Sequence, residues 1–134
     1  MPVAPLPVNV ELSLALVPAL DRTGNPEFRH SLAVKASNPG AYPVKLGEVG
    51  IGLPNGAAVG IIGDPPSVKL PYLLPEGKHC STFISIREFL SATQKMSLVG
   101  VIEIHGYYRN LSGHTYISPS MNFDIEKWKD TPLD

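Results

Sequence analysis

Alternating apolar and polar residues, interrupted at short intervals by proline and glycine, are the feature that most limits what this chain can form. Between Val8 and Leu16 every second residue is apolar, and the same period recurs in later segments. A period of two places successive side chains on opposite faces of a β-strand. The 14 prolines and 12 glycines are spread along the chain, as expected where many short strands are joined by turns. The sequence therefore predicts an all-β protein.

The spacing of these segments predicts an antiparallel β-sandwich of immunoglobulin-like type, with seven or eight strands and one short helix. A partly open barrel is the nearest alternative. The expected strands span residues 8–16, 28–37, 42–53, 57–62, 68–74, 78–84, 97–109 and 115–123, and a loop is expected over 18–26. The strand over 97–109 is expected to be the longest. Gly47 is the expected position of a bulge, because the parity of the apolar residues changes there.

One segment carries the signature of a helix N-terminus. Ser85 and Glu88 form the S-x-x-E pattern of a capping box, which predicts a helix from Ser85 to about Lys95. This helix should connect one sheet to the other, between the strand over 78–84 and the penultimate strand. Asp124 is expected to cap a short terminal turn that carries Trp128.

A chain of 134 residues, 43% of them hydrophobic, is long enough for one domain with a proper core. We expect an extended N-terminal arm over residues 1–7, a single domain over 8–128 and a C-terminal tail over 129–134. Val3 and Leu6 in the arm, together with Trp128, are candidate assembly contacts. If Trp128 packs on its own domain instead, the tail only closes the fold.

Charge distribution and the absence of targeting signals limit the classes of partner and the compartments that are expected. The 11 basic and 12 acidic residues are scattered, so neither nucleic-acid binding nor a membrane surface is expected. The N-terminus lacks the basic region of a secretion signal, and no segment is long and apolar enough for a spanning helix. The single cysteine, Cys80, excludes an internal disulfide. We expect a cytoplasmic protein, with secretion or particle association by another route left open.

Several strings resemble known domains. NPGAYPVKLGEVGIGLPNG at residues 38–56, LPYLLPEGK at 70–78 and SGHTYISPSMNFDIEKW at 112–128 resemble small uncharacterised bacterial immunoglobulin-like domains. The resemblance covers roughly residues 30–128 and rests on turn chemistry. It implies an immunoglobulin-like fold and supplies no catalytic residue or cofactor. The Cys…Trp…Cys pattern of antibody domains is absent.

No catalytic, metal or cofactor site is predicted. His79 and Cys80 are adjacent in an expected strand, so their side chains point to opposite faces, and Cys80 is expected to be a small buried residue. The four histidines do not have the spacings common in metal sites. Glu103 and His105 share a strand face, which leaves a metal-assisted hydrolase as an alternative from another class.

The feature with the most functional content is an outward stripe formed by Glu103, His105, Tyr107 and Arg109, with Tyr116 as an expected cross-strand neighbour. Tyrosine and arginine are enriched at binding hot spots, although an ordinary solvated sheet face would look the same. The leading hypothesis is a non-catalytic protein-interaction module, with a protein partner, self or foreign, and no small-molecule substrate. The alternatives are an accessory or decoration subunit of a larger assembly, such as a virion or secretion particle, and a carbohydrate-binding module using Tyr107, Tyr108 and Tyr116.

Overall fold

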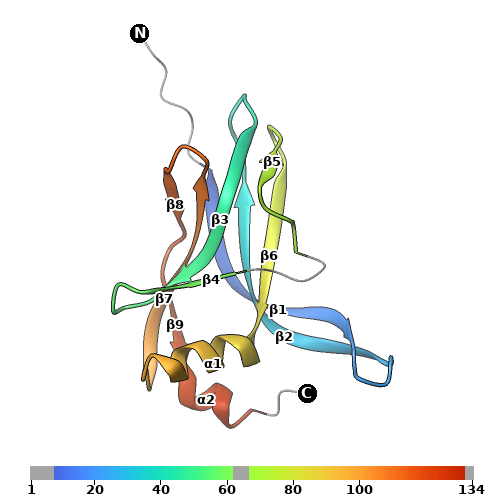
Figure 1. Ribbon diagram of the computed structural model, residues 1–134, viewed down its shortest axis with the longest axis vertical. Coiled ribbons are helices and arrows are strands. Elements are labelled where there is room, and N and C mark those ends of the chain that lie inside the picture. The colour runs from blue at the N-terminus through green and yellow to red at the C-terminus, as the bar shows by residue number, and fades with distance from the viewer. Residues whose placement is uncertain (1–7, 62–66, 132–134) are drawn as a thin grey trace.

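The computed structural model describes residues 8–61 and 67–131 (Figure 1). Its strands are β1 (Asn9–Leu20), β2 (Pro26–Ser37), β3 (Val44–Gly52), β4 (Ala58–Gly60), β5 (Tyr72–Leu74), β6 (His79–Ser85), β7 (Val101–Asn110), β8 (Thr115–Ile117) and β9 (Met121–Asp124). Two helices, α1 (Ile86–Lys95) and α2 (Ile125–Lys129), complete the described chain. The arm expected over residues 1–7, with Val3 and Leu6, lies outside the described residues.

The strands form two antiparallel sheets. The smaller sheet has the order β1-β2-β6. In the larger sheet the order is β4-β3-β7-β8, while β5 also pairs with β3 and β9 also pairs with β7. The prediction of a mostly β chain with antiparallel pairing is therefore confirmed.

One hydrophobic core joins the two sheets. Val34 of β2 and Tyr108 of β7 are both fully buried, as are residues on β3, β5 and both helices. The Tyr108 hydroxyl donates a hydrogen bond of 2.7 Å to the Val34 carbonyl and lies 3.0 Å from the Thr82 hydroxyl of β6. Because the Tyr108 hydroxyl donates its single proton to Val34, Thr82 is the donor of the second bond. A polar network thus ties β7 to two strands of the opposite sheet.

Gly106 allows the sheets to approach closely at this point. A Cβ atom at this position would lie 2.8 Å from Val34 Cγ1, which is closer than real Cβ contacts. The glycine is therefore needed for contact between β7 and β2.

The helix N-cap predicted at Ser85 is present. The Ser85 hydroxyl accepts a hydrogen bond of 3.1 Å from the Glu88 amide, and α1 links β6 of one sheet to β7 of the other as expected. Phe89 from the buried side of α1 meets Phe123 edge to face, with ring centroids 5.0 Å apart. Asp124 caps α2 through the Lys127 amide at 3.2 Å. Both helices lie at one end of the sheets (Figure 1).

The β1–β2 hairpin differs most from the prediction. Both strands have 12 residues, longer than the 10 of β7, and they take up both ends of the region expected to be a loop, so that only residues 21–25 form the turn. Pro18 sits inside β1 opposite Phe28. A proline is tolerated in an edge strand when its nitrogen points away from the ladder, which explains why it does not end the strand.

Two further predictions need correction. Leu14 and Leu16 were expected in the core, but they are 50% and 58% exposed because the hairpin extends past the opposite sheet. The strand expected over 115–123 is divided into β8 and β9, which both pair with β7. The bulge expected at Gly47 is confirmed by the register shift between Leu46 and Glu48.

Candidate interaction surface

The outer face of β7 carries the predicted stripe. Glu103 is exposed, while His105, Tyr107 and Arg109 are half-buried, and the residues between them point into the core. The four predicted residues do share one face of the strand. β7 is central in its sheet, so this face is supported on both sides by paired strands.

The rings of Tyr107 and His105 lie on two glycines of the neighbouring strand. Gly50 is directly opposite Tyr107, and Gly52 is directly opposite His105. A Cβ at Gly50 would lie 2.5 Å from the Tyr107 hydroxyl oxygen and 2.7 Å from the Val59 carbonyl, and a Cβ at Gly52 would overlap the His105 ring. The glycines therefore leave the space across β3 that the two rings occupy.

Polar contacts hold the other end of the stripe. Arg109 forms an ion pair of 3.2 Å with Glu48 on β3 and donates from Nε to the Thr115 hydroxyl of β8 at 3.1 Å. Both partners of the ion pair are well exposed, so the pair contributes little to stability. Its effect is to fix the guanidinium beside Tyr107. Burial, followed by the negative charge of Glu48, raises the pKa of the Tyr107 phenol, while Arg109 opposes the shift.

Ile117 extends this surface on the other side. It is directly opposite Tyr107 on β8 and is 60% exposed. We use the name Tyr107 face for the outer surface formed by Glu48, Gly50, Gly52, His105, Tyr107, Arg109 and Ile117. Sequence reasoning missed Ile117 and the two glycines. The turn over 110–113 could have identified Ile117, since it fixes which residues of the hairpin face each other.

Tyr116 does not belong to this surface. It lies opposite Tyr108 rather than Tyr107, and it is only 8% exposed. Because directly opposed residues share a face, Tyr116 points with Tyr108 toward the core. Its hydroxyl accepts a hydrogen bond of 3.2 Å from Asn110 Nδ2. The expectation that Tyr116 neighbours the stripe is therefore wrong.

Trp128 packs on its own domain. Its ring is stacked on Phe123, with centroids 6.2 Å apart and an interplanar angle of 8°, and it also meets His30 at 5.4 Å. The structure thus places Trp128 where it helps to close the fold, and not as a free anchor for assembly.

Two hollows adjoin the Tyr107 face, and the larger, of about 590 Å³, is lined by Glu48 and Tyr107 together with Val68 and Leu70. The hollow above Gly52, Tyr107 and Ile117 has a volume of about 220 Å³. Pockets for small ligands usually measure roughly 300–1,000 Å³ and are concave. Within residues 8–61 and 67–131, three or more histidine, cysteine or acidic residues nowhere gather closely enough to hold a metal ion. The face thus presents two rings and one guanidinium, with a shallow hollow on the Ile117 side and a larger one on the Glu48 side.

Cys80 is buried as predicted, at 7% exposure. Burial raises the pKa of its thiol, and this outweighs the opposing hydrogen bond with Tyr108. A thiol held protonated is a poor nucleophile, so this environment does not favour chemistry at Cys80.

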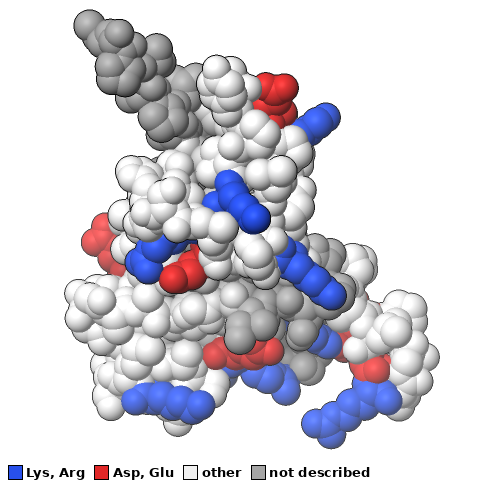
Figure 2. Space-filling model, turned by 45° about the horizontal axis from the view of Figure 1, so that its top comes forward, with Lys and Arg blue, Asp and Glu red and all other residues white. Residues whose placement is uncertain are grey.

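A larger hollow of about 650 Å³ lies between the tip of the β1–β2 hairpin and the start of α1. Its lining mixes both signs of charge, with Arg22, Arg29 and Arg87 beside Asp21, Glu27 and Glu88. Basic and acidic side chains are also interspersed over the face of the molecule that Figure 2 shows.

Comparisons with known proteins do not identify a family for this chain. No family model matches the sequence, and the search of curated proteins finds no match either. Among solved structures, the chain is similar to the "X-ray structure of Northeast Structural Genomics Consortium target SoR45", with 12% identity, 87% of this chain and 86% of that chain covered, and a TM-score of 0.40. Among the described helices, neither has the length and apolar character required to cross a membrane.

Proposed function

We propose that this protein is a non-catalytic interaction module that binds another protein through the Tyr107 face. The observation that carries the proposal is the placement of Tyr107 and His105 on glycine backbone, next to the fixed Arg109 and the exposed Ile117. Rings that are already positioned lose little conformational entropy on binding. Tyrosine and arginine are enriched at the hot spots of protein interfaces.

We further propose that the two sheets form an immunoglobulin-like β-sandwich related to small bacterial domains of that type. The proposal is supported by the turn motifs at residues 38–56 and 70–78 and by the shared core between antiparallel sheets. Domains of this architecture often bind partners through a sheet face or an edge strand.

Carbohydrate binding is not proposed further. Of the three tyrosines considered for it, Tyr108 and Tyr116 are buried in the core, so only Tyr107 could stack on a sugar. An accessory role in a larger assembly is the version of the main proposal in which the Tyr107 face binds a subunit of that assembly.

Site-specific photo-crosslinking tests the proposal. A photoreactive amino acid at position 117 is compared with the same group at Glu11, an exposed position on the outer face of the smaller sheet. We expect one discrete adduct in extract of the expressing cells from position 117 and none from position 11. Tyr107→Ser should reduce the adduct at least about tenfold, because a hot-spot side chain contributes 2 kcal/mol or more.

The control for folding is the urea unfolding midpoint of each variant. Equal adducts from both positions, no adduct from position 117, or an adduct that survives Tyr107→Ser in a folded protein would each refute the proposal.

A further inference from the structure

The outer half of the β1–β2 hairpin projects beyond the rest of the molecule (Figure 1). In this half, β1 pairs with β2 so that Leu14, Leu16, Pro18 and Leu20 lie opposite Leu32, His30, Phe28 and Pro26. Directly opposed residues of an antiparallel pair share one face. That face therefore carries Leu14, Leu16, Leu20 and Phe28, which are 50%, 58%, 63% and 65% exposed, and we call these four residues the hairpin face.

The hairpin face continues the core side of the smaller sheet. Val10 and Val34 have the same parity in their strands and are buried under the larger sheet, at 5% and 0% exposure. Where the hairpin extends past the larger sheet, the same parity carries the four exposed apolar residues and His30, and Trp128 contacts His30. This surface thus has the composition of a protein interior.

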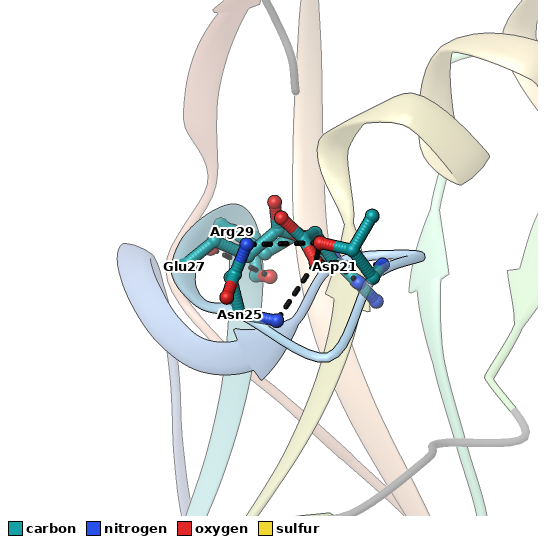
Figure 3. A network of polar contacts seen from close by, with 6 residues as sticks. Asp21, Asn25, Glu27 and Arg29 are labelled. Carbon is teal, nitrogen blue, oxygen red and sulfur yellow. Dashed lines mark hydrogen bonds and ion pairs between the residues drawn. The ribbon is translucent and has the colours of Figure 1, made fainter.

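The tip of the hairpin is polar, and the hairpin's opposite face is polar on β2 but apolar on β1, where Val17 is buried. Arg29 and Glu27, on the other face of β2, form an ion pair of 3.2 Å. At the tip, one carboxylate oxygen of Asp21 accepts hydrogen bonds from the amides of Thr23 at 2.8 Å and Asn25 at 2.9 Å (Figure 3). The Thr23 hydroxyl donates to the same oxygen at 2.7 Å, and this bond, followed by the amide bonds, lowers the pKa of Asp21, so it stays charged at neutral pH.

The polar tip bears on the choice of partner. A hairpin that entered a bilayer tip first would carry Asp21 and Arg22 into the hydrocarbon, which is costly. The hydrogen bonds to Asp21 also come from residues of the same turn, so the tip of the hairpin is held by bonds within the hairpin. A protein surface is therefore a better match for the hairpin face than a lipid surface.

The area of the face is consistent with half of a small symmetric interface. With roughly 150–200 Å² as the full surface of a large apolar residue, the four exposures leave on the order of 400 Å² of apolar surface. Two such faces in contact, with the flanking Pro18 and Pro26, bring the buried total to about 1,000 Å² or slightly more, near the lower end of specific interfaces. Segment 13–20 carries no charged residue. Two identical faces would therefore not repel each other by like charges, and a foreign partner would find no charged group there to recognise.

We propose that the hairpin face binds a second copy of this chain, with the two hairpins packed face to face across a two-fold axis. A surface that is apolar throughout is complementary to itself, and two-fold dimers use one patch on both subunits. The hairpin belongs to the smaller sheet, whereas the Tyr107 face is the outer side of the larger one. The dimer is thus independent of the function proposed above and leaves that surface open.

Light scattering coupled to size-exclusion chromatography tests the dimer on the full chain, at concentrations up to roughly 100 µM so that a micromolar Kd is detected. We expect a dimer for the unchanged chain and a monomer for Leu16→Glu and for Phe28→Glu. Val101→Glu is the matched control, because Val101 is 62% exposed but lies on β7. It should remain a dimer.

A second pair of variants covers the case in which a glutamate variant fails to fold. Leu16→Ser and Phe28→Ser should each raise the dimer Kd at least about tenfold, measured by sedimentation equilibrium. A monomeric full chain at all concentrations refutes the proposal, as does a Val101→Glu variant that dissociates to the same extent. A monomer that binds phosphatidylcholine–phosphatidylglycerol vesicles through Leu16 also refutes it, in favour of a lipid surface.

Discussion

Replacing Tyr108 by phenylalanine tests whether the polar network between the sheets stabilises the fold. The change removes only the hydroxyl, which bonds to the Val34 carbonyl at 2.7 Å and to Thr82 at 3.0 Å. Each neutral bond contributes about 0.5–1.5 kcal/mol net, and the buried Thr82 hydroxyl is left without its acceptor. We expect the free energy of unfolding to fall by about 2–3 kcal/mol. With a urea m-value of roughly 2 kcal/mol/M, the unfolding midpoint should drop by about 1–1.5 M.

Two controls separate the network from the loss of any tyrosine hydroxyl. Tyr116→Phe removes a hydroxyl whose hydrogen-bond partner among the described residues is Asn110, nearer the surface, and it should cost less than about 1 kcal/mol. Thr82→Val removes the other partner, so Tyr108→Phe should cost at least about 0.5 kcal/mol less in that background. The reasoning is refuted if Tyr108→Phe costs no more than Tyr116→Phe, or if the two changes at 82 and 108 are additive.

Three further predictions follow from buried groups. Gly106→Ala should cost about 1–3 kcal/mol in urea unfolding, because the new Cβ would meet Val34, whereas Gly60→Ala enters open space and should change little. Asn38→Asp should lower the free energy of unfolding by about 3 kcal/mol at neutral pH. Asn38 Nδ2 donates to the carbonyls of Tyr42 at 2.8 Å and Leu74 at 3.2 Å, and both carbonyls would then face a carboxylate. An unchanged urea midpoint would contradict this prediction. Burial raises the pKa of both Cys80 and Tyr108, so the stability they contribute should be complete below about pH 9 and decline as pH rises toward their folded pKa values. The decline above about pH 10 in urea midpoints should be flatter in Tyr108→Phe, and an unchanged slope would remove Tyr108 as its source.

The sequence predicted the parts of the fold that depend on local pattern. The inward positions Leu32, Val34 and Ala36 follow from a period of two, and all three are fully buried. The bulge at Gly47 and the helix start at Ser85 follow from a change of parity and from a capping box. These features are determined within a few residues of the chain, so they can be read without knowing what packs against them.

The errors have two sources: contacts with distant segments, and the register of a hairpin whose turn was not used. Leu14 and Leu16 continue the parity of β1, but the sequence does not show where the opposite sheet ends. Tyr116 was placed on the wrong face because the register of β8 depends on the turn that precedes it. Trp128 packs on His30, which is 98 residues away along the chain (128 − 30), and no local pattern could predict that contact.

The glycines of β3 connect stability with the proposed function. A glycine inside a strand costs about 0.5–1 kcal/mol relative to alanine, and β3 carries one opposite each of the two outward-facing rings, Tyr107 and His105. The rings of Tyr107 and His105 cover this backbone and recover part of that stability by cross-strand contact. At position 50 the Val59 carbonyl of β4 also excludes a side chain, so Gly50 is required by the pairing of β3 with β4. At position 52 a Cβ would meet the His105 ring, so Gly52 keeps that ring in place across β3.

The two proposed surfaces also bear on each other. Because the hairpin face and the Tyr107 face lie on different sheets, a dimer joined through the hairpins would carry two Tyr107 faces. A partner that presents repeated sites would then bind by both, and avidity could exceed the affinity of one face by about a hundredfold or more where the geometry permits. Leu16→Glu should therefore weaken binding to a repetitive partner while leaving binding to a single site unchanged. If Leu16→Glu weakened binding to the repetitive partner and to the single site equally, the hairpin would affect the Tyr107 face itself, and the loss could not be assigned to the loss of the dimer.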